Sequence, residues 1–353
     1  MPMDFIYNGQ ASNSSSCDRL LAANFDPGAL RPWKEMGKSW VEIYNANKGK
    51  REVIRTNANA TLTKEAWLQM DTAIVKAAQQ RMRVVADLRG AGLTYSVPNA
   101  LGKTVLEYQR MGDLNDAEMS MDGLRLSTND RPEFDSVFLP LPIIYKDFSF
   151  SARQIAVSRD GGAPLDTTMG EACGRKVAEY AEKLTIGRYS AYGYGGGTIY
   201  GMTNFTSRLT QTFTSPVATA FTAAGHIDEL LEARQALYDN YHYGPFMLYY
   251  SPSWDQSLDD DYNTNYGGET LRTRIMKIEG FTGMRTLDFL TNYDIVMVEM
   301  MSETIRVVMG LDVTTMEWDD LGGLRKNYRV MTIIVPQVRC DMNSRTGILH
   351  GSV

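Results

Sequence analysis

The chain has 353 residues, 43% of them hydrophobic, and its 36 basic and 42 acidic residues give a net charge of -6. This composition predicts a folded protein with a substantial core, and it excludes a disordered chain and a surface that binds nucleic acid through overall basicity. The three cysteines, Cys17, Cys173 and Cys340, have no CxxC spacing, which favours a reducing compartment.

No segment predicts secretion or insertion into a membrane. The first 16 residues lack a basic region followed by a long apolar run, so we expect no secretory signal. The most apolar window, at 293–301, is too short to span a bilayer and contains two acidic residues. We therefore interpret the glycosylation sequons at Asn13, Asn59 and Asn204 as chance matches, and we expect synthesis in the cytosol.

Residues 1–60 lack sustained periodicity and carry a Ser/Asn tract at 12–16 and a basic patch, KGKRE, at 48–52. The segment has too many apolar residues for a disordered tail. These residues are Phe5, Ile6, Leu20, Leu21, Phe25, Trp33, Trp40, Ile43 and Tyr44. We predict an arm that becomes ordered on neighbouring subunits.

Residues 61–92 predict a helix that begins at Thr63, a suitable N-cap, and ends before Gly90 and Gly92. Its apolar residues recur at helical spacing on one face. They are Trp67, Met70, Ile74, Ala78, Met82 and Val85.

Residues 93–137 alternate short apolar runs with breaks of polar, Gly, Asn and Asp residues, a pattern typical of a hairpin. The runs are LTYSV, TVLEY and LRLS. We predict a long two-stranded hairpin that projects from the body. Because an isolated ribbon is only marginally stable, we expect it to pack on a partner.

Residues 138–200 predict a strand, FLPLPIIYKDFSF, followed by a polar, Gly-rich turn and a long helix at 166–188. An apolar stripe at helical spacing predicts the buried face of that helix. The stripe consists of Met169, Cys173, Val177, Tyr180 and Leu184. Gly170 and Gly174 each cost a helix about 1 kcal/mol, so we expect close backbone packing to offset them.

Residues 201–296 predict a second, more compact region with a helix at 226–241, the strand FMLYYS, and an acidic loop at 257–268. TRIMKIEGF, at 273–281, continues this region. Residues 297–353 then contain β-branched and Met-rich strands, among them TIRVVMG and NYRVMTIIVPQV.

No pattern predicts an enzyme. His226, His242 and His350 have no metal-ligand spacing, and no nucleophile signature accompanies them. We predict that they form hydrogen bonds at the surface, and we predict no catalytic, cofactor-binding or metal-binding residues. A hydrolase with an unrecognised site is the rival interpretation from another class.

Two further clusters have alternative interpretations. The glycine run YGYGGGTIYG, at 192–201, follows a helix and precedes no GK[ST], so we predict a flexible connection between subdomains instead of a phosphate loop. An acidic cluster lacks EF-hand spacing, so we predict a solvated loop; a calcium site and an acidic pore rim are the alternatives. Its members are Asp255, Asp259, Asp260, Asp261 and Glu269.

The order of elements resembles that of encapsulins over roughly residues 61–340. LTKEAWLQMDTAIVKAAQQRM resembles their N-terminal helix, and LPLPIIYKDFSFSARQI resembles the strand that returns from their extended loop. LDTTMGEACGRKVAEYAEKLTIGR resembles their spine helix, followed by a GIxGL-like segment at 200–204. DIVMVEMMSETIRVVMGLDVTTMEW resembles the hairpin with a GxD pair, here Gly310 and Asp312, and NYRVMTIIVPQV resembles the last shell strand.

Encapsulins share their fold with the major capsid proteins of tailed bacteriophages, so the resemblance implies an α+β shell subunit. The parts that it implies are an N-terminal arm (1–60), the first helix of a peripheral domain (61–92), an extended loop (93–137), the return strand and spine helix (138–200), an axial domain (201–296) with an axis-facing loop at 257–268, and C-terminal strands that return to the peripheral domain (297–353).

The long arm and the long hairpin favour a phage capsid. The resemblance thus predicts a major capsid protein whose copies form pentamers and hexamers of an icosahedral shell around double-stranded DNA, in the virion and, during assembly, in the host cytoplasm. Scaffolding, portal and decoration proteins are further expected partners. An encapsulin-type shell that encloses cargo enzymes is the alternative. Some phage shells form Lys–Asn crosslinks, and Lys103 lies in the expected extended loop.

Overall fold

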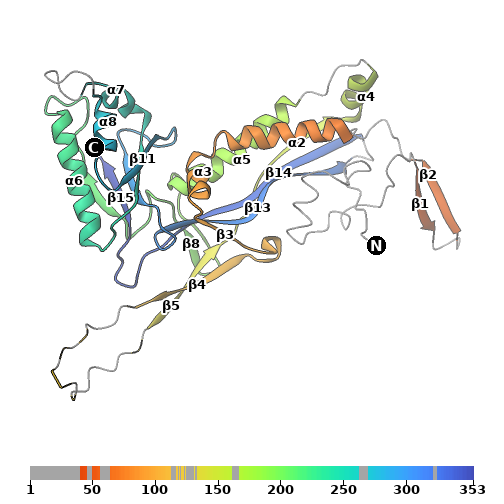
Figure 1. The fold of residues 1–353 in the computed structure, drawn as a ribbon. Coiled ribbons are helices and arrows are strands. Elements are labelled where there is room, and N and C mark those ends of the chain that lie inside the picture. The colour runs from red at the N-terminus through yellow and green to blue at the C-terminus, as the bar shows by residue number, and fades with distance from the viewer. Residues whose placement is uncertain are drawn as a thin grey trace.

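The computed structural model describes residues 40–45, 50–55, 64–112, 133–160, 167–261, 269–320 and 324–353, and single positions at 117, 119, 121–122, 124 and 131. The molecule is elongated: a four-stranded sheet with long helices lies beside a five-stranded sheet with its own helices (Figure 1). A two-stranded hairpin projects from the region between them. No helix in the described ranges is long and apolar enough to cross a membrane.

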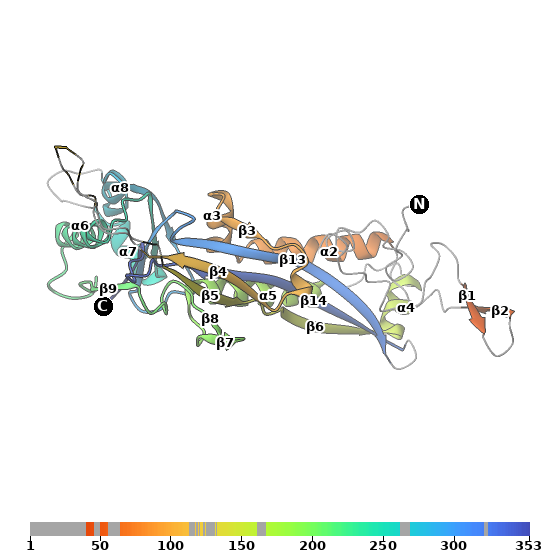
Figure 2. The same ribbon diagram turned by 90° about the horizontal axis from the view of Figure 1, so that it is seen from below.

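The four-stranded sheet has the order β3-β13-β14-β6. Its strands are β3 (Thr94–Ser96), β6 (Ile144–Ser151), β13 (Ile305–Asp320) and β14 (Arg325–Val338). The two long strands, β13 and β14, pair antiparallel and extend from the five-stranded sheet toward the far end of the molecule (Figure 2). Most residues of β14 are buried, as expected for its β-branched sequence.

Four helices accompany this sheet. They are α2 (Lys64–Gln79), α3 (Arg83–Gly90), α4 (Ala152–Asp160) and α5 (Thr168–Ile186). The sequence predicted α2 and α3 as one helix and did not predict α4 at all. The predicted apolar face of the first helix is nonetheless buried from Met70 to Val85, whereas the side chain of Trp67 lies outside the described residues.

The helix α2 packs directly on the two glycines of α5, which confirms the expected close approach. A Cβ atom at Gly174 would lie 2.8 Å from both Cγ2 and the carbonyl oxygen of Ile74. A Cβ atom at Gly170 would lie 3.0 Å from Cδ1 of the same side chain. Both glycines therefore make room for the neighbouring helix.

The predicted stripe on α5 is partly wrong. Cys173, Val177 and Leu184 are buried, but Met169 is 48% exposed and Tyr180 is 41% exposed. The buried face is instead centred on small residues, because the backbone of α2 comes so close that larger side chains lie at its edges. These small residues are Gly170, Cys173, Gly174, Ala178 and Ala181.

The five-stranded sheet has the order β11-β10-β12-β15-β9. Its strands are β9 (Leu209–Thr212), β10 (Phe246–Tyr250), β11 (Phe281–Thr286), β12 (Ile295–Glu299) and β15 (Ile348–Ser352). Its helices are α6 (Ala223–Asp239), α7 (Asp255–Leu258) and α8 (Leu271–Met276), with a 3-10 turn, η5 (Pro252–Trp254). TRIMKIEGF thus ends α8 and begins β11.

The last strand corrects one expectation. Residues 297–353 were expected to return together to the first sheet, and β13 and β14 do lie there. The strand β15 instead pairs antiparallel with β12 and parallel with β9 in the second sheet. Every residue of β12 is buried, and the strand is central in its sheet, paired with β10 at one edge and with β15 at the other.

The projecting hairpin consists of β4 (Val105–Met111) and β5 (Phe134–Pro140), which pair antiparallel as predicted. Two details differ from the prediction. LTYSV does not belong to the hairpin, because it forms β3 in the first sheet and is followed by a 3-10 turn, η4 (Ala100–Gly102). FLPLPIIYKDFSF forms two strands, β5 and β6, with the break at residues 141–143. Most of LRLS lies outside the described residues.

The glycine run after α5 forms a further two-stranded ribbon instead of the predicted flexible connection. Its strands, β7 (Tyr192–Tyr194) and β8 (Gly197–Ile199), are joined through Gly195 and Gly196 at positive φ. A Cβ atom at Gly197 would overlap the carbonyl oxygen of Phe138 in β5. The glycines therefore allow this ribbon to pack on the base of the projecting hairpin.

Within the predicted arm, β1 (Trp40–Asn45) and β2 (Lys50–Arg55) pair antiparallel. The rest of the arm, and the side chains of both strands, lie outside the described residues.

Candidate functional site

Among the residues that the structure describes, no group of three His, Cys, Asp or Glu side chains could hold a metal ion. The three histidines contact three different carboxylates. Nδ1 of His242 lies 2.5 Å from Oε2 of Glu299, and Nε2 of His350 lies 3.7 Å from Oδ1 of Asp294. His242 makes the hydrogen bond that the sequence predicted, whereas the contact of His350 is too long for one.

His226 was predicted at the surface and is instead fully buried. Its ring stacks on Trp254 with centroids 4.5 Å apart, and Nδ1 is 3.6 Å from the nearest carboxylate oxygen, on Glu229. The prediction failed because α6 begins three residues earlier than expected, with Thr222 as its N-cap, so that His226 lies on the inner face. Burial lowers the pKa of His226 to about 4.

The acidic cluster is largely paired with cations. Arg272 contacts two of its carboxylates, with Nε 2.8 Å from Asp259 and Nη2 3.1 Å from Asp255, and Glu269 pairs with Lys277. Residues 262–268 lie outside the described residues, so the acidic pore rim stays a prediction.

Two segments that carried the resemblance are sites of close packing. Gly310, in β13, has no room for a side chain because a Cβ atom would overlap that of Ala100. Asp312 lies 3.6 Å from Arg89 of α3. In the 200–204 segment, Asn204 accepts a hydrogen bond from the backbone N–H of Gly201 at 2.7 Å and thereby closes the turn after α5. The sequon at Asn204 is thus part of a turn in which the Asn204 side chain is already hydrogen-bonded.

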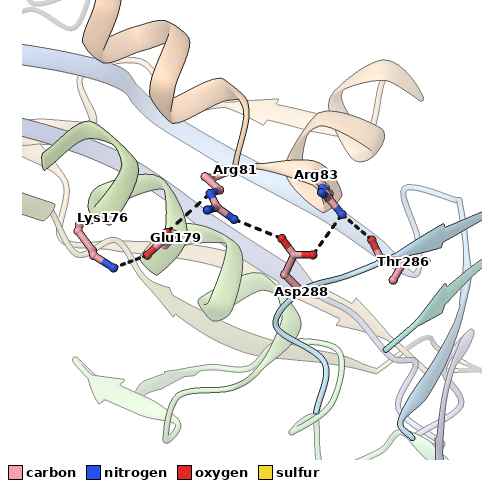
Figure 3. A network of polar contacts seen from close by, with 6 residues as sticks. All are labelled: Arg81, Arg83, Lys176, Glu179, Thr286 and Asp288. Carbon is pink, nitrogen blue, oxygen red and sulfur yellow. Dashed lines mark hydrogen bonds and ion pairs between the residues drawn. The ribbon is translucent and has the colours of Figure 1, made fainter. Parts of the chain in front are cut away.

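A network of polar contacts joins the two halves of the molecule (Figure 3). Arg81, between α2 and α3, lies 3.8 Å from Glu179 of α5 and 3.3 Å from Asp288, which follows β11. Arg83 contacts the same Asp288 at 3.4 Å and donates a hydrogen bond to the carbonyl oxygen of Thr286 at 3.0 Å. Both halves are therefore fastened at the break between α2 and α3.

A second junction lies beside the base of the hairpin. Glu299, at the end of β12, is buried and accepts hydrogen bonds from Thr304 Oγ1 at 2.7 Å and from the backbone N–H of Gly244 at 3.1 Å, in addition to its contact with His242. Despite its burial, these partners hold the pKa of Glu299 below its ordinary value.

Next to this junction the surface has a depression of about 870 Å³. Three arginines line it: Arg110 of β4, and Arg339 and Arg345 after β14. Arg110 pairs with Asp135 across the hairpin, and Arg345 lies 3.9 Å from Asp341. Its rim exposes a large aromatic side chain, because Tyr241 is 64% exposed, and Tyr243, two residues further along the chain, is 65% exposed. Arginine and tyrosine are the residues enriched at protein interfaces.

The projecting hairpin exposes further apolar side chains. Phe134 of β5 is 60% exposed, and Met119, Met121 and Leu124 are exposed beyond it. Lys103, the expected crosslinking lysine, is exposed just before β4, and its crosslink stays a prediction. Exposed apolar residues on a ribbon with only two strands favour a contact with another molecule.

Solved structures with this architecture are particles and capsids. The virus-like particle from Pyrococcus furiosus superposes with a TM-score of 0.55 and 14% identity, covering 80% of this chain and 98% of that one. The capsid of Myoviridae phage XM1 superposes with a TM-score of 0.53 and 9% identity, covering 70% and 85%. The chain therefore has the α+β fold shared by phage capsid proteins and encapsulins.

A curated relative is similar in sequence as well. The type 1 encapsulin shell protein EncA of Myxococcus xanthus is 22% identical over 228 residues, which are 63% of this chain and 70% of the relative. A family model described as a family of unknown function, DUF6260, matches residues 57–351. By this match over most of its length, the chain belongs to DUF6260.

Proposed function

We propose that the protein is the major capsid protein of a tailed bacteriophage, which assembles without enzymatic activity into an icosahedral shell around double-stranded DNA. The observation that carries this proposal is the projecting β4–β5 hairpin, with exposed Phe134, on a fold that occurs in capsids. Such a ribbon needs a surface to cover it, and the copies of a shell protein supply that surface to one another.

The parts of the subunit are assigned on the same basis. Residues 1–60 act as the arm and 93–137 as the extended loop, although within that span β3 belongs to the body. The peripheral domain comprises the four-stranded sheet with α2, α3 and α5. The axial domain comprises the five-stranded sheet, including β15. Heterologous contacts repeated around symmetry axes then close pentamers and hexamers into a shell.

Further partners follow from the proposed role. The interior of the shell contacts packaged DNA without sequence preference, and scaffolding, portal and decoration proteins act during assembly in the host cytoplasm and in the virion. A net charge of -6 agrees with a shell that encloses DNA without binding it over its whole surface.

The second candidate is an encapsulin-type shell that encloses cargo enzymes. The sequence similarity to the Myxococcus xanthus shell protein favours it. The arm of about 60 residues and the long hairpin favour the phage capsid instead.

The experiment that tests the proposal is expression of the full chain alone, followed by size exclusion and negative-stain microscopy. We expect particles or capsomers far larger than the 39.6 kDa chain. Co-expression with the neighbouring genes of its source then separates the two candidates: packaged DNA indicates a capsid, and a protein cargo indicates an encapsulin. A chain that stays monomeric under all assembly conditions, scaffolding protein included, contradicts both.

A further inference from the structure

Two arginines beside the depression at the hairpin base have no carboxylate partner among the described residues. Nη1 of Arg339 donates to the carbonyl oxygen of Ser302 at 3.3 Å, and its guanidinium lies 5.7 Å from the ring of Tyr108. Arg306 of β13 donates to Oε1 of Gln337, and its guanidinium lies 4.5 Å from the ring of Tyr95. Burial and the nearby charge of Arg339 lower the pKa of Arg306. Glu303 and Asp341 also line the depression, but neither forms an ion pair with Arg306 or Arg339 among the described residues, so these two cations favour a further acidic ligand.

The outer face of α6 has the complementary charge. Asp228, Glu232 and Asp239 are exposed, and their spacing of four and seven residues places them on one side of the helix. Asp239 accepts a hydrogen bond from Gln235 at 2.8 Å, but no cation contacts any of the three carboxylates within the described part of the chain. These three residues, here called the acidic stripe, extend over about 16 Å of helix.

No ion pair joins the stripe to these arginines within the described part of one chain. The helix α6 lies at the outer side of the five-stranded sheet (Figure 1), and residues 240–242, which follow its C-terminal end, line the depression. Arg306 and Arg339 are beside the root of the hairpin, with Arg110 of β4 close by. Complementary patches at different places on one subunit are the arrangement that a head-to-tail contact between copies requires.

We propose that the acidic stripe on α6 of one copy docks at the arginine-lined depression of the next copy. The occupant is a second copy because it presents carboxylates at helical spacing, and because the exposed Tyr241, which lines the depression, supplies apolar contact area. The inference rests on the proposed function, in which neighbouring subunits surround a common axis. The charges of the stripe and of the arginines then set how two neighbouring copies align along this contact.

The test is a charge reversal with rescue. Arg339→Glu and Glu232→Lys each place like charges opposite one another, so each is expected to lower the assembled fraction by about tenfold or more at low salt. The double variant, Arg339→Glu with Glu232→Lys, is expected to restore assembly. Arg153→Glu, which reverses an exposed arginine on α4 at the other end of the molecule, is the matched control and is expected to assemble as the wild type does.

A crosslink keeps the test independent of how well a reversed variant folds. In the Arg339→Lys variant the positive charge is retained, and the side chain gains a primary amine. Zero-length carbodiimide coupling is then expected to join this amine in one copy to a stripe carboxylate of another copy. The readout is the linked peptide found by mass spectrometry in dimers and larger species. Its absence from assembled particles overturns the inference.

Other outcomes are equally decisive. If particles form and the single reversals assemble normally, or if the double variant does not recover, the docking is wrong while the proposed function stands. If Arg339→Glu particles assemble but lose packaged DNA, the arginines bind phosphate and the inference fails. If the wild-type chain forms no particle under any assembly condition, scaffolding protein included, the proposed function fails, and the crosslink in concentrated solution still decides whether this contact forms.

Discussion

At the scale of single residues, His226 shows how position within a helix changes the chemistry of a side chain. It stacks on Trp254 inside the core of the five-stranded sheet, where burial favours the neutral imidazole. Its pKa is about 4 in the folded chain, against an ordinary value of 6.5. It is therefore a packing residue whose contribution to stability depends on pH.

This burial predicts a loss of stability in acid. Between pH 6.5 and 4 the unfolded chain binds more protons at this position than the folded chain, so the free energy of unfolding decreases as the pH falls through this range, by about 3 kcal/mol in all. His226→Gln is expected to remove that contribution. Urea unfolding of the unassembled chain at pH 7 and pH 4.5 measures it, and an equal loss in both proteins contradicts the prediction.

At the scale of elements, Glu182 explains why one predicted helix became two. Its buried carboxylate accepts hydrogen bonds from the backbone N–H groups of Val84, at 2.6 Å, and Val85, at 3.4 Å. These are N–H groups of the first turn of α3, which have no partner within the helix. Glu182 on α5 thereby starts α3 in a new direction. The sequence pattern of residues 63–89 does not predict this break.

The burial of Glu182 predicts that stability changes with pH in the opposite direction to the change expected from His226. Burial raises the pKa of Glu182 to about 7, from an ordinary 4.5, so between these values the folded chain holds more protons than the unfolded chain. The free energy of unfolding is therefore expected to decrease as the pH rises from 4.5 to 7, by about 3 kcal/mol. Glu182→Gln, which keeps one acceptor oxygen, is expected to flatten this dependence.

Glu182→Ala provides the contrast for that measurement. It leaves the N–H groups of Val84 and Val85 without their acceptor, so it is expected to destabilise the chain by about 1–3 kcal/mol at pH 5, where Glu182 is protonated in the folded wild-type chain. Urea unfolding at pH 5 and pH 8 separates the two effects. The prediction for Glu182→Gln is contradicted if the wild-type chain loses less stability than this variant between pH 5 and pH 8.

The packing of α2 on α5 gives a second prediction at this scale. In an exposed helix, replacing glycine by alanine stabilises by about 1 kcal/mol. At Gly174 the added methyl group would meet the backbone carbonyl of Ile74, so Gly174→Ala is expected to destabilise by about 1–3 kcal/mol. At Gly170 the added methyl group would meet side-chain atoms of Ile74 and Phe148 and no backbone atom, so Gly170→Ala is the matched control, with a smaller effect. Equal effects in thermal unfolding would argue against this packing.

At the scale of the whole molecule, the two sheets are held together by contacts between distant parts of the sequence. Arg81 and Arg83 reach Asp288, and Glu299 gathers donors from residues 242, 244 and 304. Exposed ion pairs such as those of Asp288 contribute at most about 1 kcal/mol each, whereas the buried Glu299 depends on its donors. The relative position of the two sheets, and with it the spacing of any contact around an axis, therefore depends on these junctions.

The sequence by itself determined the kinds of elements and most of their order. Apolar spacing identified α2, α5 and α6, and alternating runs identified the β4–β5 hairpin and the long strands. These elements follow from local periodicity, which a single chain displays directly. The capsid-like fold was implied by the resemblance of these segments to encapsulins. The need for small residues where helices touch was also visible, in Gly170 and Gly174.

Only the tertiary structure decided where these elements meet. It placed β15 in the second sheet, ordered the glycine run against β5, buried His226 and divided the first helix at Glu182. It also gathered Arg306 and Arg339 beside Arg110, which lies far earlier in the sequence. Such juxtapositions depend on contacts between segments far apart in the chain, and the free energy of those contacts leaves no periodic signal in the sequence.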